Sequence, residues 1–296
     1  MKTHSGEWQM VIAMALSGTI GLFVLASGQS VPTVIFFRCL IGSLTLLGWL
    51  RWRRGWVPLS WRALGWLLLG AGALLLNWYC LFSAYSRSSI SVATVVYHVQ
   101  PFFLVLLAAL AQKEIPSKRK LLWLLMAFVG VAMSSGIDVG GGASAMFAGA
   151  ALACTAAFLY ALATLATKKL SGIPPAQIAG MQLLIGVAVL APLTDIPGMG
   201  TPLASLLSLG ALGLIHTGLL YQLMYSAFQK LPAARIANLS FIYPLMAILV
   251  DMACFGTRLS PMQCLGMFLI LLAVIANQRD WQMPALRAPR RGRHVP

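Results

Sequence analysis

Most apolar residues of the chain are grouped in ten long runs, and each run is bounded by charged residues, Gly or Pro. A run of about 20 mostly apolar residues, wound as a helix, crosses a hydrocarbon layer about 30 Å thick. The connections between the runs are short and leave no stretch for a separate soluble domain. The pattern predicts an all-α integral membrane protein with ten transmembrane helices, at residues 8–26, 33–50, 63–84, 90–110, 121–137, 145–166, 176–194, 203–226, 236–255 and 261–278.

The composition excludes an ordinary soluble protein. Hydrophobic residues make up 59% of the 296 residues and charged residues only 9%, whereas a soluble domain carries about 25% charged residues. The mean hydropathy of +0.85 leaves too few polar residues to coat a water-soluble fold. The membrane interpretation of the ten runs therefore holds for the chain as a whole.

The basic residues follow the alternation of the ten spans. Of the 21 Lys and Arg, 18 fall on one side of the membrane, only Arg87 and Arg258 fall on the other, and Arg38 lies inside a span. Such a bias marks the cytoplasmic side. We therefore expect both termini in the cytoplasm of a bacterial-type inner membrane, and no nucleic-acid partner. A basic tail, residues 279–296, that also binds anionic lipid is compatible with this topology.

The chain is similar to itself at a shift of 143 residues, which aligns residues 83–85 with 226–228 and Pro101 with Pro244. Each unit holds five spans, an odd number, so the second unit enters the membrane from the opposite side. Inverted repeats are the architecture of many secondary transporters, whose two copies exchange inward and outward conformations around a midplane site. We therefore expect two five-helix repeats, at residues 1–137 and 145–278.

A family resemblance is carried by two stretches, FSAYSRSSISVATVVYHVQPFFLVLLAALAQKE at 82–114 and YSAFQKLPAARIANLSFIYPLMAILVDMACFGT at 225–257. Both resemble the signature half of the EamA repeat, which defines much of the drug/metabolite transporter superfamily. The resemblance covers nearly the whole chain and implies a transporter with ten helices in two inverted repeats. Within the superfamily the chain looks most like aromatic amino-acid exporters of the YddG type. Arg38 and Glu114 match an Arg and a Glu of the repeat, whereas Thr257 departs from that Glu in the second copy.

Sequence motifs for catalysis and nucleotide binding are absent. The chain has no G-x-x-x-x-G-K-[ST], no H-E-x-x-H and no G-x-S-x-G. The five Cys all lie in apolar runs without a C-x-x-C pair, and we expect them to pack as small hydrophobes. We therefore expect no enzymatic activity, no metal site and no cofactor.

Polar side chains within the spans are candidate site residues, because an unpartnered polar group is costly in hydrocarbon. In the fourth span Ser91, Thr94, His98 and Pro101 recur at spacings of three or four and form one polar stripe. We interpret His98, near the midplane, as lining a cavity; packing against a neighbouring helix is the alternative. For His216 packing is favoured, since its neighbours are mostly small or apolar.

A substrate site is predicted at the level where the two repeats meet. Amide, imidazole and phenol groups hydrogen-bond a zwitterion without fixed charge, and an uncharged site favours rapid release. Aromatic walls accept varied side chains, although packing is an equally open interpretation of the deep aromatic residues. The predicted substrate-binding residues are Asn77, Trp78, Tyr79, Tyr97, His98, Tyr221 and Tyr243.

Two prolines and two charged residues complete the candidate site. Pro101 and Pro244 are predicted hinges, because Pro removes a helical hydrogen bond and crowds the preceding turn. Arg38 and Asp251 each lie a turn or two from the predicted periplasmic end of a helix. We expect these two charges to pair or to rim the outer mouth.

Together these features predict an inner-membrane secondary transporter that exports amino acids by alternating access, with broad specificity and a preference for aromatic or apolar side chains. Two alternatives stay open. One is a non-transporting component of a membrane assembly or lipid pathway, whose cavity binds without turnover. The other is a small multidrug-type exporter of cations, which requires a deep acid, and Asp251 is the only candidate.

Overall fold

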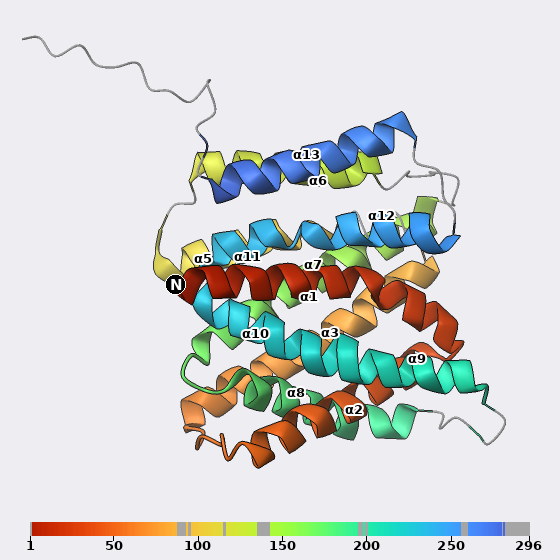
Figure 1. Ribbon diagram of the computed structural model, residues 1–296. Helices are drawn as coiled ribbons and strands as arrows, with labels where there is room; N and C mark the ends of the chain where they lie inside the picture. Colours follow the sequence, from red (N-terminus) through yellow and green to blue (C-terminus); the bar gives the residue numbers. More distant parts are fainter. Residues whose placement is uncertain are drawn as a thin grey trace, which may run out of the picture.

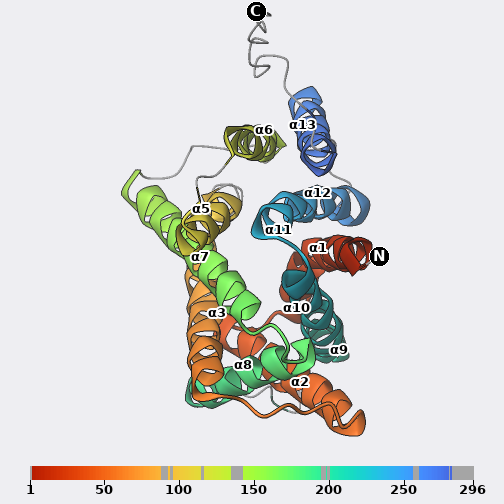
Figure 2. The same cartoon turned by 90° about the vertical axis from the view of Figure 1, so that its left-hand side faces the viewer.

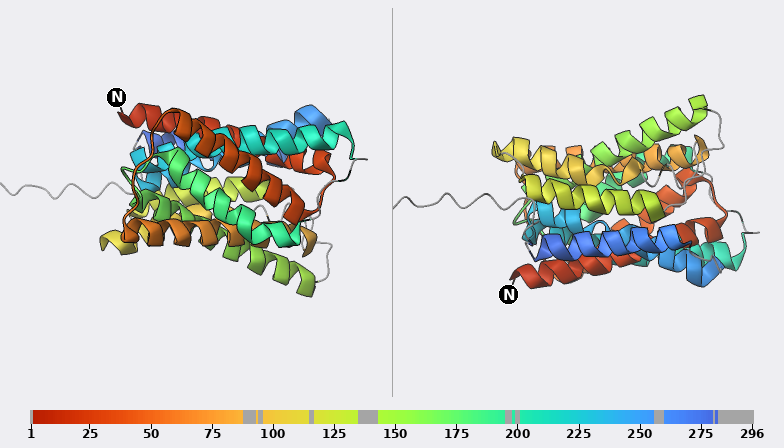
Figure 3. Two further views of the ribbon diagram at one scale, coloured as in Figure 1. Left: turned by 90° about the horizontal axis from the view of Figure 1, so that it is seen from below. Right: turned by 90° about the horizontal axis from the view of Figure 1, so that it is seen from above.

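A computed structural model describes residues 2–87, 93, 96–114, 117–134, 143–194, 198, 201–255, 260–279 and 281. All regular structure in these ranges is helical. The long helices run roughly along one common direction, as the side view and the views from below and above show (Figures 1 and 3).

The helices of the first half lie on the predicted spans, except that the span predicted at 90–110 is described as a helix only from Gln100, after a turn at His98 and Val99. A turn in which Gly28 has a φ of +60° joins the first two helices, and Gly tolerates this left-handed conformation. The described helices of this half are α1 (Lys2–Ser27), α2 (Val31–Trp52), α3 (Trp61–Arg87), α5 (Gln100–Gln112) and α6 (Lys118–Ser134).

The second half contains two interrupted helices. The predicted span 203–226 is one helix with a π-helical segment in its middle, and the helix after it breaks at Ser240 and Phe241, just before Pro244. The described helices are α7 (Ala143–Lys169), α8 (Pro175–Leu190) with a 3-10 turn (Ala191–Leu193), α9 (Leu203–Gly213), the π segment η2 (Leu214–Leu219), α10 (Leu220–Lys230), α11 (Ala233–Leu239), α12 (Ile242–Phe255) and α13 (Pro261–Gln278).

The described helices are those of a multi-pass membrane protein. Seven segments are long and apolar enough to cross a membrane, and two shorter apolar helices, Gln100–Gln112 and Cys264–Asn277, accompany them. The all-helical class predicted from the sequence is confirmed, whereas the number of ten spans stays a prediction. The seven segments are His4–Val24, Val31–Trp52, Trp61–Ala84, Phe147–Lys169, Pro175–Leu193, Leu203–Lys230 and Ala233–Cys254.

The helices pack in a two-fold pattern. In the first half α3 and α5 pack on α7, and in the second half α10 and α12 pack on α1, so each half places its first helix against the other half. Seen along the helices in Figure 2, the pair α6 and α13 lies at the top of the bundle and the pair α2 and α8 at the bottom. The two halves therefore exchange helix contacts in a related way, while their division into five spans each stays a prediction.

Small residues allow α2 to approach its neighbours closely. A Cβ atom at Gly42 would lie 2.6 Å from Thr217 Cγ2 in η2, and one at Gly186 in α8 would lie 2.7 Å from Cys39 Sγ. Within a bilayer, helix association depends on such close packing, because lipid is as apolar as the helix surface. Gly42 and Gly186 therefore fix how the two halves meet at α2.

The bundle has two chemically different ends. α1 begins and α13 finishes at the same end, on the left in Figure 1. Most basic residues at the termini of the described helices lie there, so we call it the basic end; we call the opposite end, where α1 joins α2, the open end. The basic end is marked by Arg51, Lys113, Lys118, Lys169 and Lys230.

Candidate functional site

A cavity of about 450 Å³ lies between the two halves of the chain. Its walls come from α1, α2, α3, α5 with the turn before it, α7, α10 and the break between α11 and α12. Gly21 and Val31, both exposed, line it next to the α1–α2 turn. Toward the basic end the lining stops at Met14 in α1 and Met224 in α10. The cavity therefore occupies the half of the bundle that faces the open end.

Most residues that the sequence predicted for the site line this cavity. They are Asn77, Trp78, Tyr97, His98, Tyr221, Tyr243, Pro101 and Arg38. Two predicted residues do not line it, Pro244 and Tyr79, and the Tyr79 side chain is 61% exposed. Successive helix residues are rotated by about 100°, so Trp78 faces the cavity while Tyr79 faces away. Ser91, Thr94 and the side chain of Asp251 lie outside the described residues.

Residues related by the 143-residue shift pack against each other at the cavity wall. The ring of Trp78 packs edge-on against its counterpart Tyr221, with centroids 5.9 Å apart. His98 lies 6.3 Å from its counterpart Phe241 and stacks on Tyr243 at 5.4 Å with an angle of 10° between the rings. Trp78, Tyr221 and Tyr243 therefore pack on other rings while lining the cavity, and stacking on a substrate stays a prediction.

Two amide side chains at the cavity have polar atoms without a described partner. The Nδ2 group of Asn77 donates to the carbonyl oxygen of Ala156 at 2.7 Å and to Tyr97 Oη at 3.3 Å. Its Oδ1 atom is buried and has no hydrogen-bond partner among the described residues, and neither has Nε2 of Gln100. The cavity therefore offers one buried acceptor and one buried donor to a bound molecule.

Arg38 adds a positive charge to the cavity wall. The side chain is only 2% exposed, and its Cζ atom lies 4.6 Å from the ring centroid of Trp78. Its Nε donates to Thr217 Oγ1 at 3.1 Å and its Nη2 to the carbonyl oxygen of His216 at 3.4 Å. No carboxylate of a described residue lies within ion-pair distance. The expectation of a cavity without fixed charge is corrected, since the guanidinium reaches inward from α2; its predicted pair with Asp251 stays a prediction.

The π-helical segment η2 provides both partners of Arg38. Thr217 Oγ1 also donates to the carbonyl oxygen of Leu212, five residues earlier, at 2.8 Å. A π segment widens a helix locally and is frequent at functional sites. His216 itself does not line the cavity: its Nε2 lies 2.7 Å from Thr19 Oγ1 in α1 and its ring 4.8 Å from Phe23. The packing role expected for His216 fits these contacts.

The helix breaks before the two prolines border the cavity. The turn before Pro101 contains His98, and the turn before Pro244 contains Ser240; both residues line the cavity. Pro cannot donate to the carbonyl one turn earlier and its ring crowds that carbonyl, which explains why each helix is interrupted there. The two halves therefore carry equivalent breaks at the depth of the cavity.

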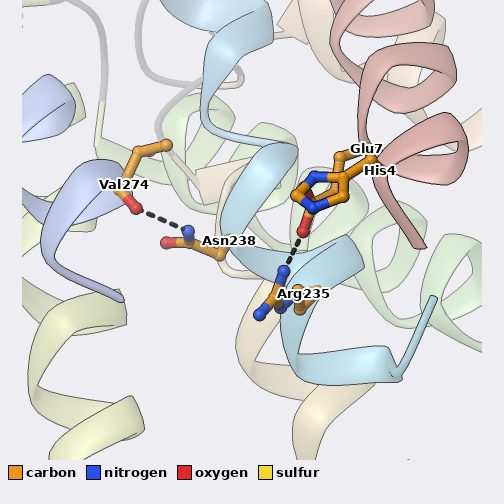
Figure 4. Close-up of polar contacts among 5 residues, drawn as sticks. All are labelled: His4, Glu7, Arg235, Asn238 and Val274. Carbon is orange, nitrogen blue, oxygen red and sulfur yellow. Dashed lines mark hydrogen bonds and ion pairs between the residues drawn. The ribbon is translucent and has the colours of Figure 1, made fainter. Parts of the chain in front are cut away.

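The basic end is closed by polar contacts that the sequence analysis missed. Glu7 in α1 pairs with Arg235 in α11, and Asn238 in α11 donates to the carbonyl oxygen of Val274 in α13 at 3.0 Å, so α11 is held from two sides (Figure 4). The only sequence signal for Glu7 is that it is an acid on the strongly basic side of the membrane.

Two further groups of contacts hold α10 at the basic end. Gln9 Oε1 in α1 accepts from Lys230 Nζ at 2.8 Å and from Ser226 Oγ at 3.0 Å. Lys168 Nζ, at the end of α7, donates to the carbonyl oxygens of Phe228 at 2.9 Å and of Leu231. We call the contacts of Glu7, Gln9 and Lys168 the basic-end latch. It connects α1 and α7 to the turn between α10 and α11.

Comparison with known proteins finds relatives of known sequence and of known structure. The chain is 29% identical over 275 residues to the uncharacterized transporter YxxF of Bacillus subtilis (strain 168). The aligned region covers 88% of this chain and 86% of that protein. It is 34% identical over 130 residues to the pseudopaline exporter CntI of Pseudomonas aeruginosa (strain UCBPP-PA14), covering 42% and 44%. A solved crystal structure superimposes with a TM-score of 0.80 over 92% of this chain and 96% of that one; at 18% identity it shows a shared fold.

The family is established by two separate matches. The model of the EamA-like transporter family matches residues 4–136 and again residues 147–277, which together make up most of the chain. The two segments coincide with the two halves that exchange helix contacts in the structure. The chain belongs to the EamA-like transporter family.

Proposed function

We propose that the protein is a secondary transporter of the inner membrane that exports amino acids by alternating access, through ten helices in two inverted repeats at residues 1–137 and 145–278. The observation that carries this proposal is a cavity between the halves that is lined by repeat-related residues and stops before a closed basic end. A cavity that reaches only one end of the bundle is one of the two states that alternating access requires.

The basic-end latch is the inner gate of this transporter. If the basic end faces the cytoplasm, as the distribution of Lys and Arg indicates, the cavity faces the periplasm in this structure. Inward opening then requires α10 and α11 to leave α1 and α7, which breaks the contacts of Glu7, Gln9 and Lys168. Pro101 and Pro244 are the proposed hinges, since the helix breaks before them leave the halves of each helix free to tilt.

The size and chemistry of the cavity favour an amino acid as substrate. Its volume of about 450 Å³ lies within the roughly 300 to 1,000 Å³ of small-molecule sites. Trp78, Tyr97, His98, Tyr221 and Tyr243 supply aromatic walls that suit apolar side chains without selecting one shape. We therefore propose broad specificity with an aromatic or apolar preference.

The relatives support transport and its direction. One curated relative is named a transporter and another an exporter, and the second matches less than half of this chain. We propose export for this protein on that likeness and on the open end facing the periplasm. A cation exporter of the multidrug type is disfavoured, because Arg38 places a positive charge in the cavity wall and would repel a cationic substrate.

Counterflow in proteoliposomes tests the proposal. Purified protein is reconstituted with unlabelled phenylalanine inside, and uptake of labelled phenylalanine and threonine is measured with and without a proton gradient. We expect both amino acids to exchange, phenylalanine faster than threonine. An excess of either unlabelled amino acid should inhibit uptake of the other. Binding without exchange would instead identify a non-transporting membrane component, and exchange of organic cations but not of amino acids would favour the multidrug alternative.

A reporter fusion tests the topology separately. A reporter that is active only in the cytoplasm, fused after Trp281, is expected to be active, because the helix before it, α13, finishes at the basic end. A fusion after Gly28, in the α1–α2 turn, is the matched control and should be inactive with that reporter. Activity after Gly28 but not after Trp281 would reverse the orientation and make the present conformation inward-open.

A further inference from the structure

Resting on the proposed function, we propose that Arg38 binds the carboxylate of the substrate and that Asn77 Oδ1 accepts a hydrogen bond from its ammonium group. The cavity then holds a zwitterion in one orientation, with a charged anchor for the anion and a neutral anchor for the cation. Both residues line the cavity and both are buried, at 2% and 0% exposure.

The case for Arg38 begins with the lack of a counterion among the described residues. A buried guanidinium is costly unless a charge or enough acceptors surround it. The described residues give it two oxygen acceptors, on Thr217 and His216, and the face of Trp78, but no carboxylate. A guanidinium has five N–H donors, so the hydrogen bonds to Thr217 and His216 leave three for a ligand. A carboxylate is the anion whose two oxygens match that fork.

The surroundings of Arg38 hold it in place for such a ligand. Nε and Nη2 are tied to the π-helical segment, and Trp78 lies against the guanidinium at 4.6 Å. The position of the cation is therefore set by the protein before any anion arrives, which lowers the ordering cost of binding. The close approach of Gly42 to Thr217 brings η2 within reach of this side chain.

The case for Asn77 rests on the direction of its amide. Both N–H groups of Nδ2 are used, by Ala156 O and Tyr97 Oη, so the amide cannot rotate without losing both bonds. This leaves Oδ1 as a buried acceptor with no partner among the described residues. An ammonium group, which carries only donors, satisfies it. The fixed amide therefore selects a donor and rejects a second anion.

Trp78 connects the two anchors. It follows Asn77 in α3, its ring lies against Arg38, and its edge packs on Tyr221. An amino acid bound between the anchors places its side chain against these two rings. The sequence signals were an Arg inside an apolar span and an Asn beside a Trp, yet only the fold shows that they share one cavity.

Calorimetric titration of the purified protein in nanodiscs tests both anchors without relying on transport. The probes are phenylalanine, phenylalaninamide, which lacks the carboxylate, and phenylpropionate, which lacks the ammonium group, in a chloride-free buffer. We expect phenylalanine to bind at least about tenfold more tightly than either analogue, as charge-assisted hydrogen bonds are lost in each. Equal affinity for phenylalanine and its amide in the wild type would overturn the carboxylate anchor, even where no variant folds.

Variants assign each loss to one anchor. Arg38→Gln is expected to reduce the affinity for phenylalanine and phenylpropionate at least about tenfold and to leave phenylalaninamide within about twofold. Asn77→Leu is expected to reduce phenylalanine and phenylalaninamide but not phenylpropionate. Thr217→Val is the matched control, because it removes one contact of Arg38 while the charge remains. A Thr217→Val loss as large as that of Arg38→Gln would show that Arg38 acts by holding the fold.

The outcomes separate this proposal from the proposed function. Counterflow of amino acids with no change on Arg38→Gln overturns the anchor and leaves the transporter. Arg38-dependent binding of phenylpropionate without counterflow of any amino acid supports the anion anchor and overturns the amino-acid transporter. Chloride that binds in an Arg38-dependent manner, without competing against phenylalanine, identifies a small inorganic anion as the occupant and also overturns the carboxylate assignment.

Discussion

The two halves of the protein build the same scaffold but use polar groups differently. Trp78 and Tyr221, and likewise His98 and Phe241, occupy related positions and pack against each other, yet of the second pair only His98, from the first half, lines the cavity. A shift of 144 residues relates Arg38 to Gln182, which accepts from Tyr225 Oη at 2.6 Å and does not line the cavity. At this position the first half therefore contributes Arg38 to the cavity wall, while the second half binds the corresponding Gln182 to Tyr225 away from the cavity.

The helices that carry these residues differ in the same sense. α3 is one uninterrupted α-helix, whereas its counterpart is divided into α9, η2 and α10. The interruption presents Thr217 and the carbonyl of His216 to Arg38. Thr217 and His216 of the second half thus position the charge of Arg38, which belongs to the first half. Duplication explains the scaffold, and divergence of single residues explains the chemistry.

The largest expected effect is at the His98 and Phe241 pair. His98→Ala should reduce counterflow of phenylalanine and threonine together by at least about tenfold, because it removes an imidazole of the cavity wall that stacks on Tyr243. Phe241→Leu is the control and should change rates by less than about threefold, since Phe241 is fully buried. Unchanged rates for both amino acids in the His98 variant would make it a packing residue and remove the difference between the halves at this level.

A second test uses the glycines on which the halves meet. Gly42→Ala brings a methyl group against Thr217, the partner of Arg38, while Gly186→Ala meets the side chains of Cys39 and Leu75. Overpacking costs about 1–3 kcal/mol. We expect both variants to unfold at lower temperature, but only Gly42→Ala to slow counterflow, by about fivefold beyond any loss of protein. Equal rates in the two variants, at equal amounts of folded protein, would contradict the view that Thr217 positions Arg38.

The proline breaks should behave alike in both halves. Pro101→Ala and Pro244→Ala are each expected to restore the helical hydrogen bond, leave the protein folded and slow transport by about threefold, because a continuous helix bends less readily. Counterflow rates with size-exclusion profiles measure this. Wild-type rates in both variants would make the breaks static kinks, and an effect in only one would show that a single half moves.

The sequence predicted the fold well because its signals are local. Span length depends on residues that lie near one another in the chain, and the repeat depends on residues that recur at a fixed distance; the orientation predicted from the charge bias stays a prediction. The site was harder to predict. The sequence shows how far along a helix a residue lies, but it does not show which face of the helix lines the cavity. The sequence predicted both Trp78 and Tyr79 for the site, although they are neighbours in one helix. Trp78 lines the cavity, whereas Tyr79 lies on the surface of the bundle.

Contacts between distant segments were beyond the sequence pattern. Arg38 looked like part of an outer rim from its position in α2, and only the approach of η2 and Trp78 shows that its guanidinium turns into the cavity. The basic-end latch joins Glu7 to Arg235, which are far apart in the chain, and neither belongs to a repeat-related pair that the shift identifies. Such pairs arise from the tertiary structure rather than from periodicity.

The smallest expected effect is at the basic-end latch, where one ion pair acts together with several hydrogen bonds, some of them donated by Lys ammonium groups. Glu7→Gln keeps the shape of the side chain and removes the charge facing Arg235, whose side chain is 39% exposed while that of Glu7 is 20% exposed. An ion pair at this exposure contributes only about 0–1 kcal/mol. The contacts of Gln9 and Lys168 remain, so we expect counterflow to change by about twofold or less.

The matched variant Gln9→Ala removes the acceptor shared by Lys230 and Ser226, and the double variant should weaken the latch more than either change alone. Labelling of a cysteine placed at Met10, which is fully buried in α1 between Gln9 and the cavity, with the five native Cys replaced, then reports how often the basic end opens. We expect labelling to increase in the order wild type, Glu7→Gln, double variant. Unchanged labelling in the double variant would mean that this end is not the gate, and the contrast between an open and a latched end would lose its functional meaning.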